Sequence, residues 1–133
     1  MTSVSELNKR KVRLFVEAVW NQGELELIDE LVAADHLGHL SYLQEPVVGP
    51  EGVRRLVSSH HHAYPDLCIK IDHQIAEDDC VASRWRASAT SWESLGSTGR
   101  LRSWTGISLI RLLAGMQVDT YTIVVPTATD AAT

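Results

Sequence analysis

The sequence has few of the residues on which stapled or membrane-bound small proteins depend. Its 133 residues include only two cysteines, four prolines and one phenylalanine, so a disulfide-rich scaffold is excluded. No apolar run approaches the roughly 20 residues that a membrane-spanning helix needs. Residues 1–6 lack the cationic and apolar regions of a signal peptide. We therefore expect a cytoplasmic protein that does not bind membranes.

Positive charge is also scarce. Twelve Lys and Arg residues against seventeen Asp and Glu residues give a formal net charge of −5. A protein that binds nucleic acid normally presents a basic surface, so we expect no nucleic-acid partner. The length suits one domain with its own core, which we assign to residues 1–126. The small, polar segment 127–133 is predicted to be a disordered tail.

The two cysteines are predicted to be free thiols. Cys68 and Cys80 fall on two predicted strands that turn at residues 77–79. In that register Cys68 lies near Ser88 and Cys80 lies beside the turn, an offset of about eight residues or roughly 26 Å. A disulfide needs Cα atoms within about 7 Å of each other, so the pair cannot be bridged.

Three helices are predicted in the first half of the chain. A capping box begins the first helix, over residues 3–21, and a shorter helix is predicted from about residue 24 to 33. A short strand over residues 36–43 follows. The third helix is predicted from Pro50 to Tyr64, and its apolar stripe has members at helical spacing: Val53, Leu56, Val57, His60 and Tyr64.

In the rest of the chain, side-chain character alternates with a period of two, which predicts four antiparallel strands. Two of them cover residues 67–75 and 81–90, and the other two form a hairpin over residues 101–125 that turns at residues 113–115. Along the first strand, one face is predicted to hold Leu67, Ile69, Ile71, His73 and Ile75. The faces expected to line a pocket are Ser83, Trp85, Ala87 and Ala89; Trp104, Gly106, Ser108 and Ile110; and Met116, Val118, Thr120, Thr122 and Val124. Helices that precede strands favour an α+β fold. We expect a cone in which a curved antiparallel sheet and three N-terminal helices enclose a cavity suited to a small apolar ligand.

Several motifs in order resemble the SnoaL-like polyketide cyclases, a branch of the nuclear-transport-factor-2-like (NTF2-like) cone fold. The chain has V-W-N-Q-G at 19–23 followed by L-I-D-E-L-V-A at 27–33, then G-P-E-G-V at 49–53, Y-P-D-L at 64–67 and I-A-E-D-D-C-V-A-S-R-W at 75–85. The resemblance covers residues 8 to 125. It implies a cofactor-independent enzyme of polyketide or related secondary metabolism that catalyses cyclisation, rearrangement or hydroxylation of a hydrophobic small molecule.

The resemblance also implies that the usual carboxylate is missing. The cyclases carry a general acid/base Asp on the last strand, and the matching run at 115–122 places Thr122 there. The Asp-Arg-Asp constellation of related epoxide hydrolases falls on Thr122, Trp85 and Ala87, so we do not expect that reaction. A threonine hydroxyl is not a base near neutral pH without an activating neighbour. Asp119 lies on the opposite strand face and is predicted to be a surface charge.

Proton transfer is therefore assigned to two histidines. His39 matches a histidine that family members often carry after the second helix, and imidazole titrates near neutrality. It could equally be a hydrogen-bonded structural residue. His60 lies on the apolar face of the third helix, where it could instead be a core group. No metal is expected, because the consecutive histidines at 60–62 point about 100° apart on a helix.

Substrate binding is assigned to five residues: Tyr64, Trp85, Trp104, Ser108 and Thr122. The indoles suit a planar ligand, and the hydroxyls could anchor its carbonyl or hydroxyl groups, although the aromatic residues could serve only to pack the cone. The alternative is a non-catalytic ligand-binding or dimeric scaffold module, since fold does not settle function. The outer sheet face, with Ile107, Tyr121 and Ile123, is apolar enough to bury a second copy, and the resemblance implies a homodimer.

Overall fold

The computed structural model describes residues 3–91 and 99–126. Its elements in chain order are α1 (Val4–Leu14), the π-helical η1 (Phe15–Asn21), the 3-10 turn η2 (Leu25–Leu27), α2 (Ile28–Leu31), β1 (Val32–Leu40), β2 (Val47–Val48), α3 (Gly49–Ala63), β3 (Cys68–Glu77), β4 (Cys80–Ser91), β5 (Arg100–Leu113) and β6 (Met116–Pro126). The predicted tail at 127–133 lies outside the described residues. Within the described ranges, no helix has both the length and the apolar character to cross a bilayer.

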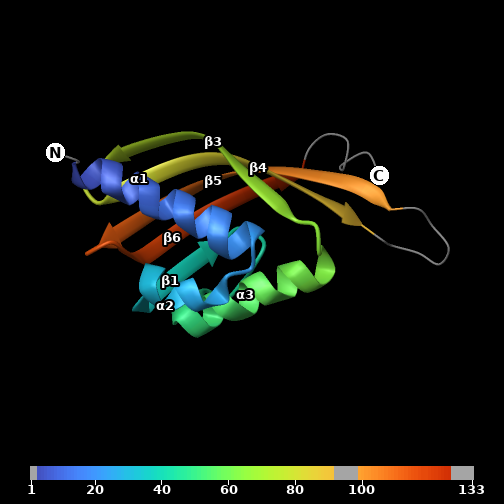
Figure 1. The fold of residues 1–133 in the computed structure, drawn as a ribbon, viewed down its shortest axis with the longest axis horizontal. Helices are drawn as coiled ribbons and strands as arrows, with labels where there is room; N and C mark the ends of the chain where they lie inside the picture. Colours follow the sequence, from blue (N-terminus) through green and yellow to red (C-terminus); the bar gives the residue numbers. More distant parts are fainter. Residues whose placement is uncertain (1–2, 92–98, 127–133) are drawn as a thin grey trace.

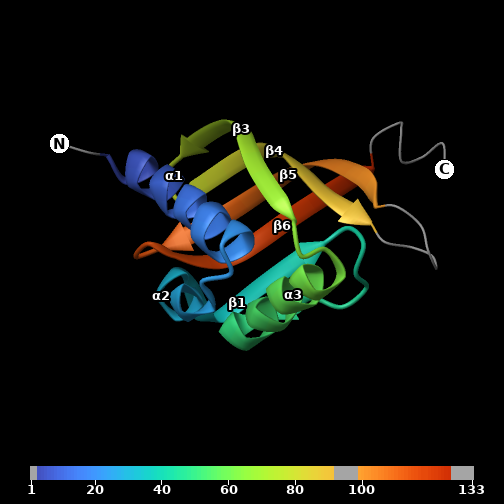
Figure 2. The same cartoon turned by 45° about the vertical axis from the view of Figure 1, so that its right-hand side comes forward.

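The six strands form one curved sheet in the order β2-β1-β6-β5-β4-β3. Figures 1 and 2 show α1 lying across the β3 side of its concave face and α3 lying along the β1 side. This arrangement confirms the α+β fold with three helices. The strands β3 to β6 are antiparallel as predicted. The sheet as a whole is mixed rather than purely antiparallel, because β1 pairs parallel to β6.

The first helix begins and ends with side-chain hydrogen bonds. At its start, the Ser3 side chain accepts a hydrogen bond from the backbone N–H of Glu6 at 3.1 Å, as the capping box predicts. At its end, the Asn21 amide binds both polar backbone groups of Ile69 on the edge strand β3. Its Oδ1 accepts from the Ile69 N–H at 2.7 Å and its Nδ2 donates to the Ile69 carbonyl at 2.8 Å. Asn21 therefore fixes the helix to the sheet.

The second predicted helix is much shorter than expected. Regular α-helix ends at Leu31, and Val32 has the extended dihedral angles φ −123° and ψ 125°. The strand β1 consequently begins four positions before the predicted start at residue 36. The Val32 N–H still donates to the Ile28 carbonyl and closes the last helical turn. Its extended backbone brings it opposite Gln117 of β6, a conformation that suits a β-branched residue.

Two β-bulges change which side chains face inward. The β3–β4 register shifts between Ile71 and His73, and Ile75 is 62% exposed as a result. The β5–β6 register shifts between Arg111 and Leu112, which turns Gln117 inward and leaves it 3% exposed. The prediction that His73 and Ile75 share a strand face with Ile71 is therefore wrong, because a bulge inserts one residue and reverses the alternation. The predicted inward positions of Met116 and Val118 are wrong for the same reason.

The predicted cysteine register is confirmed. Cys68 pairs with Ser88, and Cys80 pairs with Glu77 beside the turn. Both thiols are free.

Candidate functional site

A cavity of about 450 Å³ lies between the concave face of the sheet and the helices. Since a water molecule occupies about 30 Å³ of the liquid, the cavity has room for about fifteen, and its size falls within the range of ligand pockets. Among the described residues, its lining contains no Asp, Glu, Lys, Arg or Cys side chain. The lining residues that can titrate are His36, Tyr42, His60 and Tyr64. The site is therefore apolar and free of fixed charge.

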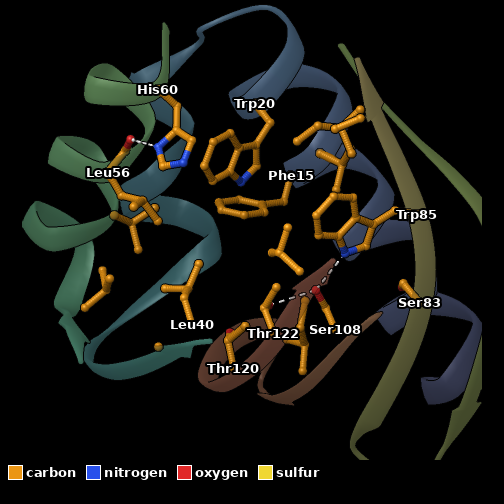
Figure 3. Close-up of a pocket in the computed structure, with 18 of the residues that line it drawn as sticks. Phe15, Trp20, Leu40, Leu56, His60, Ser83, Trp85, Ser108, Thr120 and Thr122 are labelled. Carbon is orange, nitrogen blue, oxygen red and sulfur yellow. Dashed lines mark hydrogen bonds between the residues drawn. The ribbon is translucent and has the colours of Figure 1, made fainter. Parts of the chain in front are cut away.

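A hydrogen-bonded pair of hydroxyls lies on the sheet side of this cavity, which we call the floor. Ser108 of β5 stands opposite Thr122 of β6, and their side-chain oxygens are 2.8 Å apart. The Trp85 indole N–H donates to the Ser108 oxygen at 3.0 Å (Figure 3). The pair holds two hydroxyl protons, and only one is used between them. One O–H is therefore left to donate to a ligand, whichever way the pair is oriented.

Gly106 creates the space for the Trp85 indole. These two residues are cross-strand neighbours on β5 and β4. A Cβ at Gly106 would lie 2.2 to 2.7 Å from three carbons of the Trp85 ring, much closer than van der Waals contact allows. The missing side chain at Gly106 thus allows the indole to lie flat over β5 with its N–H near Ser108.

A second polar group lies on the opposite wall, on α3. The His60 Nδ1–H donates to the Leu56 carbonyl at 2.8 Å, which leaves Nε2 as an acceptor. The Tyr42 hydroxyl lies 3.0 Å from Nε2 and can donate to it. Burial raises the pKa of Tyr42 to about 12, so Tyr42 keeps its proton at neutral pH. The rings of Trp20 and His60 meet edge to face, with their centroids 5.3 Å apart.

Six of the seven predicted site residues line this one cavity. They are His60, Tyr64, Trp85, Trp104, Ser108 and Thr122. The rings of Tyr64 and Trp104 meet edge to face at 5.2 Å, which joins the end of α3 to β5.

His39 lies apart from the others. It stacks on Tyr121 at 4.6 Å between ring centroids, and Tyr121 belongs to the outer sheet face with 55% of its surface exposed. The predicted place of His39 in the pocket is therefore wrong. The physical reason is the alternation of β1, which directs His36, Gly38 and Leu40 into the cavity.

The sequence interpretation missed His36, the histidine that β1 does turn inward. Its side chain is 3% exposed, and its Nε2 lies 2.9 Å from the Thr120 hydroxyl. Burial lowers the pKa of His36, and the nearby Asp119 and Asp35 carboxylates oppose that shift only in part. Alternation along residues 36–40 places His36 and His39 on opposite strand faces, so only one of them could have entered the cavity.

In the described part of the chain, no group of three or more His, Cys, Asp or Glu side chains is arranged to hold a metal ion.

Comparisons with known proteins agree with this architecture. The family model for "SnoaL-like polyketide cyclase" matches residues 10–120. The structure of IdmH, a proposed polyketide cyclase from Streptomyces antibioticus, is 27% identical with a TM-score of 0.77 over 88% of this chain and 91% of that one. A proposed polyketide cyclase from Acidithiobacillus ferrooxidans is 23% identical, with a TM-score of 0.77 over 92% and 91% of the two chains.

A third similar structure has a different described activity. AclR, a proposed hydroxylase from Streptomyces galilaeus, is 24% identical, with a TM-score of 0.73 over 89% of this chain and 88% of that one. No functionally curated protein matches the sequence. The family match spans most of the domain and includes strands that form the cavity, so the chain belongs to the SnoaL-like polyketide cyclase family, with its NTF2-like fold.

Proposed function

We propose that this protein binds a flat, largely apolar ketone of polyketide or similar origin and catalyses its cofactor-independent cyclisation or rearrangement. The observation that supports the proposal best is the Ser108–Thr122 pair, which offers a hydroxyl donor inside a cavity free of fixed charge. Such a donor stabilises negative charge on a carbonyl oxygen more strongly than it would in water. The indoles of Trp85 and Trp104 supply flat surfaces for the ligand.

The proposed reaction begins with loss of a proton from the carbon next to the ligand carbonyl. The Tyr42 hydroxyl takes that proton and gives its own to Nε2 of His60, whose Nδ1–H is held by the Leu56 carbonyl. The electron pair of the broken C–H bond moves to the carbonyl oxygen. This oxygen accepts a hydrogen bond from the free O–H of the Ser108–Thr122 pair. The enolate carbon then attacks a second carbonyl of the same molecule. A new C–C bond forms, and the resulting alkoxide takes the proton back through Tyr42.

Turnover of candidate polyketide intermediates tests this proposal. We expect His60→Gln and Tyr42→Phe to lower kcat by about 10²–10⁴-fold, the usual contribution of general acid–base catalysis. Ser108→Ala should lower kcat by about 10²-fold, as loss of an oxyanion donor does. The exposed neighbour His62→Ala is the matched histidine control and should be unaffected. His39→Ala tests the sequence-based assignment and should also retain turnover.

The outcomes separate the two function classes. Turnover that survives both His60→Gln and Tyr42→Phe contradicts the proton-transfer assignment. Ligand binding by the wild-type protein without any turnover supports the alternative, a non-catalytic binding module.

The outer sheet face supports a further proposal, that the protein is a homodimer. Ile107 pairs with Ile123 at the centre of this face, and the two side chains are 58% and 62% exposed. Tyr121 and Val125 extend the apolar surface along β6, both more than half exposed. A stable interface buries about 800 Å² per partner, and a second copy of the same face could supply the matching apolar area. A monomeric mass at micromolar concentration would contradict this proposal.

A further inference from the structure

We propose that Thr120, positioned by the buried His36, is a second hydrogen-bond donor on the cavity floor, so that the ligand presents two acceptor oxygens to β6. This inference rests on the proposed function and extends it. His36 acts through Thr120 and is a positioning residue, whereas Thr120 contacts the ligand.

The first step in the argument is the tautomer of His36. Its Nδ1 is buried and has no hydrogen-bond partner among the described residues, and its Nε2 lies 2.9 Å from the Thr120 oxygen. A buried N–H without a partner is rare, and a buried acceptor without one is less rare. We therefore assign the proton of the neutral ring to Nε2, which donates to Thr120.

The second step is the direction of the Thr120 hydroxyl. Because Thr120 accepts from His36, its own O–H is free to donate. Thr120 lines the cavity, so a ligand oxygen is the partner that this proton can reach. The arrangement repeats the one at Ser108, where the N–H of the half-buried Trp85 donates to a hydroxyl that belongs to the floor. Each N–H polarises its hydroxyl and strengthens it as a donor.

The third step is the spacing of the two donors. Thr120 and Thr122 are next-but-one residues on the same face of β6, so their Cα atoms lie about 7 Å apart. Two carbonyl oxygens on one small ring, separated by a single ring carbon, can meet two donors at this spacing. Gly38 leaves room for the His36 ring, since a Cβ there would approach its Cε1 to 3.1 Å.

A matched pair of ketones tests the inference. 2,2-Dimethylindane-1,3-dione carries two carbonyl oxygens on its five-membered ring, one on each side of the dimethyl carbon, and 2,2-dimethylindan-1-one has nearly the same shape with one. Neither can form an enol, so catalysis does not disturb the measurement. We expect calorimetric titration to show about 3- to 10-fold tighter binding of the dione by the wild-type protein, the affinity that one net hydrogen bond supplies.

Three substitutions identify the donor. Thr120→Val keeps the shape of the side chain and should abolish the preference for the dione, with the affinity for the monoketone unchanged within about twofold. His36→Leu should at least halve the preference. His36→Gln should restore it, because the Gln amide N–H can replace Nε2–H. The exposed Thr105→Val on the outer face of β5 is the control and should keep the full preference.

The results distinguish this inference from the proposed function. If His36 or Thr120 had a purely structural role, its substitution would weaken the binding of both ketones to the same extent. A preference for the dione that survives Thr120→Val, or a wild-type protein with no preference, overturns the inference and leaves the proposed function standing. A wild-type protein that binds neither ketone contradicts the proposed function, and the inference falls with it.

Discussion

The two faces of the sheet use the same strands for opposite purposes. The inner face carries its polarity as neutral groups in partnership, such as Ser108 with Thr122. The outer face carries charges in ion pairs, such as Arg86 with Asp72 at 2.9 Å and Arg111 with Asp119 at 3.2 Å. A charge inside would need a partner to offset its desolvation, whereas water screens the exposed pairs. Substitutions inside the cone should therefore have large effects, and those outside should have small ones.

The largest loss of stability is expected for Gly106→Ala. The new Cβ would overlap three carbons of Trp85, so we place the loss in unfolding free energy near the upper end of the overpacking range, about 3 kcal/mol. Urea denaturation measures it. In a Trp85→Leu background the same substitution should lose much less, because the ring is gone. A loss below about 0.5 kcal/mol, the usual limit for an innocuous surface change, would show that the indole does not occupy this space.

A smaller effect is expected for Ser108→Ala. The change leaves the Trp85 N–H and the Thr122 hydroxyl without their partner. An unsatisfied buried group costs about 1–3 kcal/mol, and we expect a loss toward the lower end because Trp85 is only half-buried. Thr122→Val should cost less in the Ser108→Ala background than in the wild-type protein, because the hydrogen bond is already lost. Strictly additive losses in a double-mutant cycle would contradict the pairing.

The pH dependence of stability tests whether His36 on the inner face is shielded from solvent. Burial lowers the pKa of folded His36 below its ordinary 6.5, so the unfolded chain binds a proton first as the pH falls. Stability should therefore decrease below pH 6.5, by no more than about 1.4 kcal/mol per pH unit. His36→Gln should remove this component. Identical pH profiles of the wild-type and variant proteins would show that His36 is not desolvated.

The smallest effect on folding is expected for Ile123→Lys on the outer face. Its side chain is 62% exposed, so the unfolding free energy of the monomer should change by less than about 0.5 kcal/mol. The same change places a charge in the proposed dimer interface. Analytical ultracentrifugation should then show half the wild-type mass, and an unchanged dimer would exclude this face as the interface.

The contrast between the faces was only partly predictable from the sequence. Along β4 the alternation is unbroken, so Ser83, Trp85 and Ala87 were placed correctly in the cavity. Along β1 both faces carry a leucine, Leu37 outside and Leu40 inside. Hydrophobicity therefore did not distinguish His36 from His39.

The β-bulges could not be predicted from the sequence, for a different reason. Val118 on β6 is the residue by which the register shifts, because Arg111 pairs with Asp119 and Leu112 with Gln117. Nothing in the local composition marks that insertion, which is set by how two long strands twist against each other. The hydroxyl pairing of Ser108 with Thr122 depends on the register beyond this bulge. The position of the hairpin turn at residues 113–115 was predicted correctly. The strand faces of the first residues after it, Met116 to Val118, were not.

The two hydrogen bonds between the Asn21 amide and Ile69 bear on the tendency of the protein to aggregate at high concentration. The strand β3 is an edge strand of the sheet. The unpaired N–H and C=O groups of an exposed edge strand can pair with strands of other molecules, which leads to aggregation. Asn21 occupies both polar backbone groups of Ile69, so a foreign strand finds no free hydrogen-bonding groups at that residue. One amide side chain thereby removes a donor and an acceptor from the edge to which a foreign strand would pair.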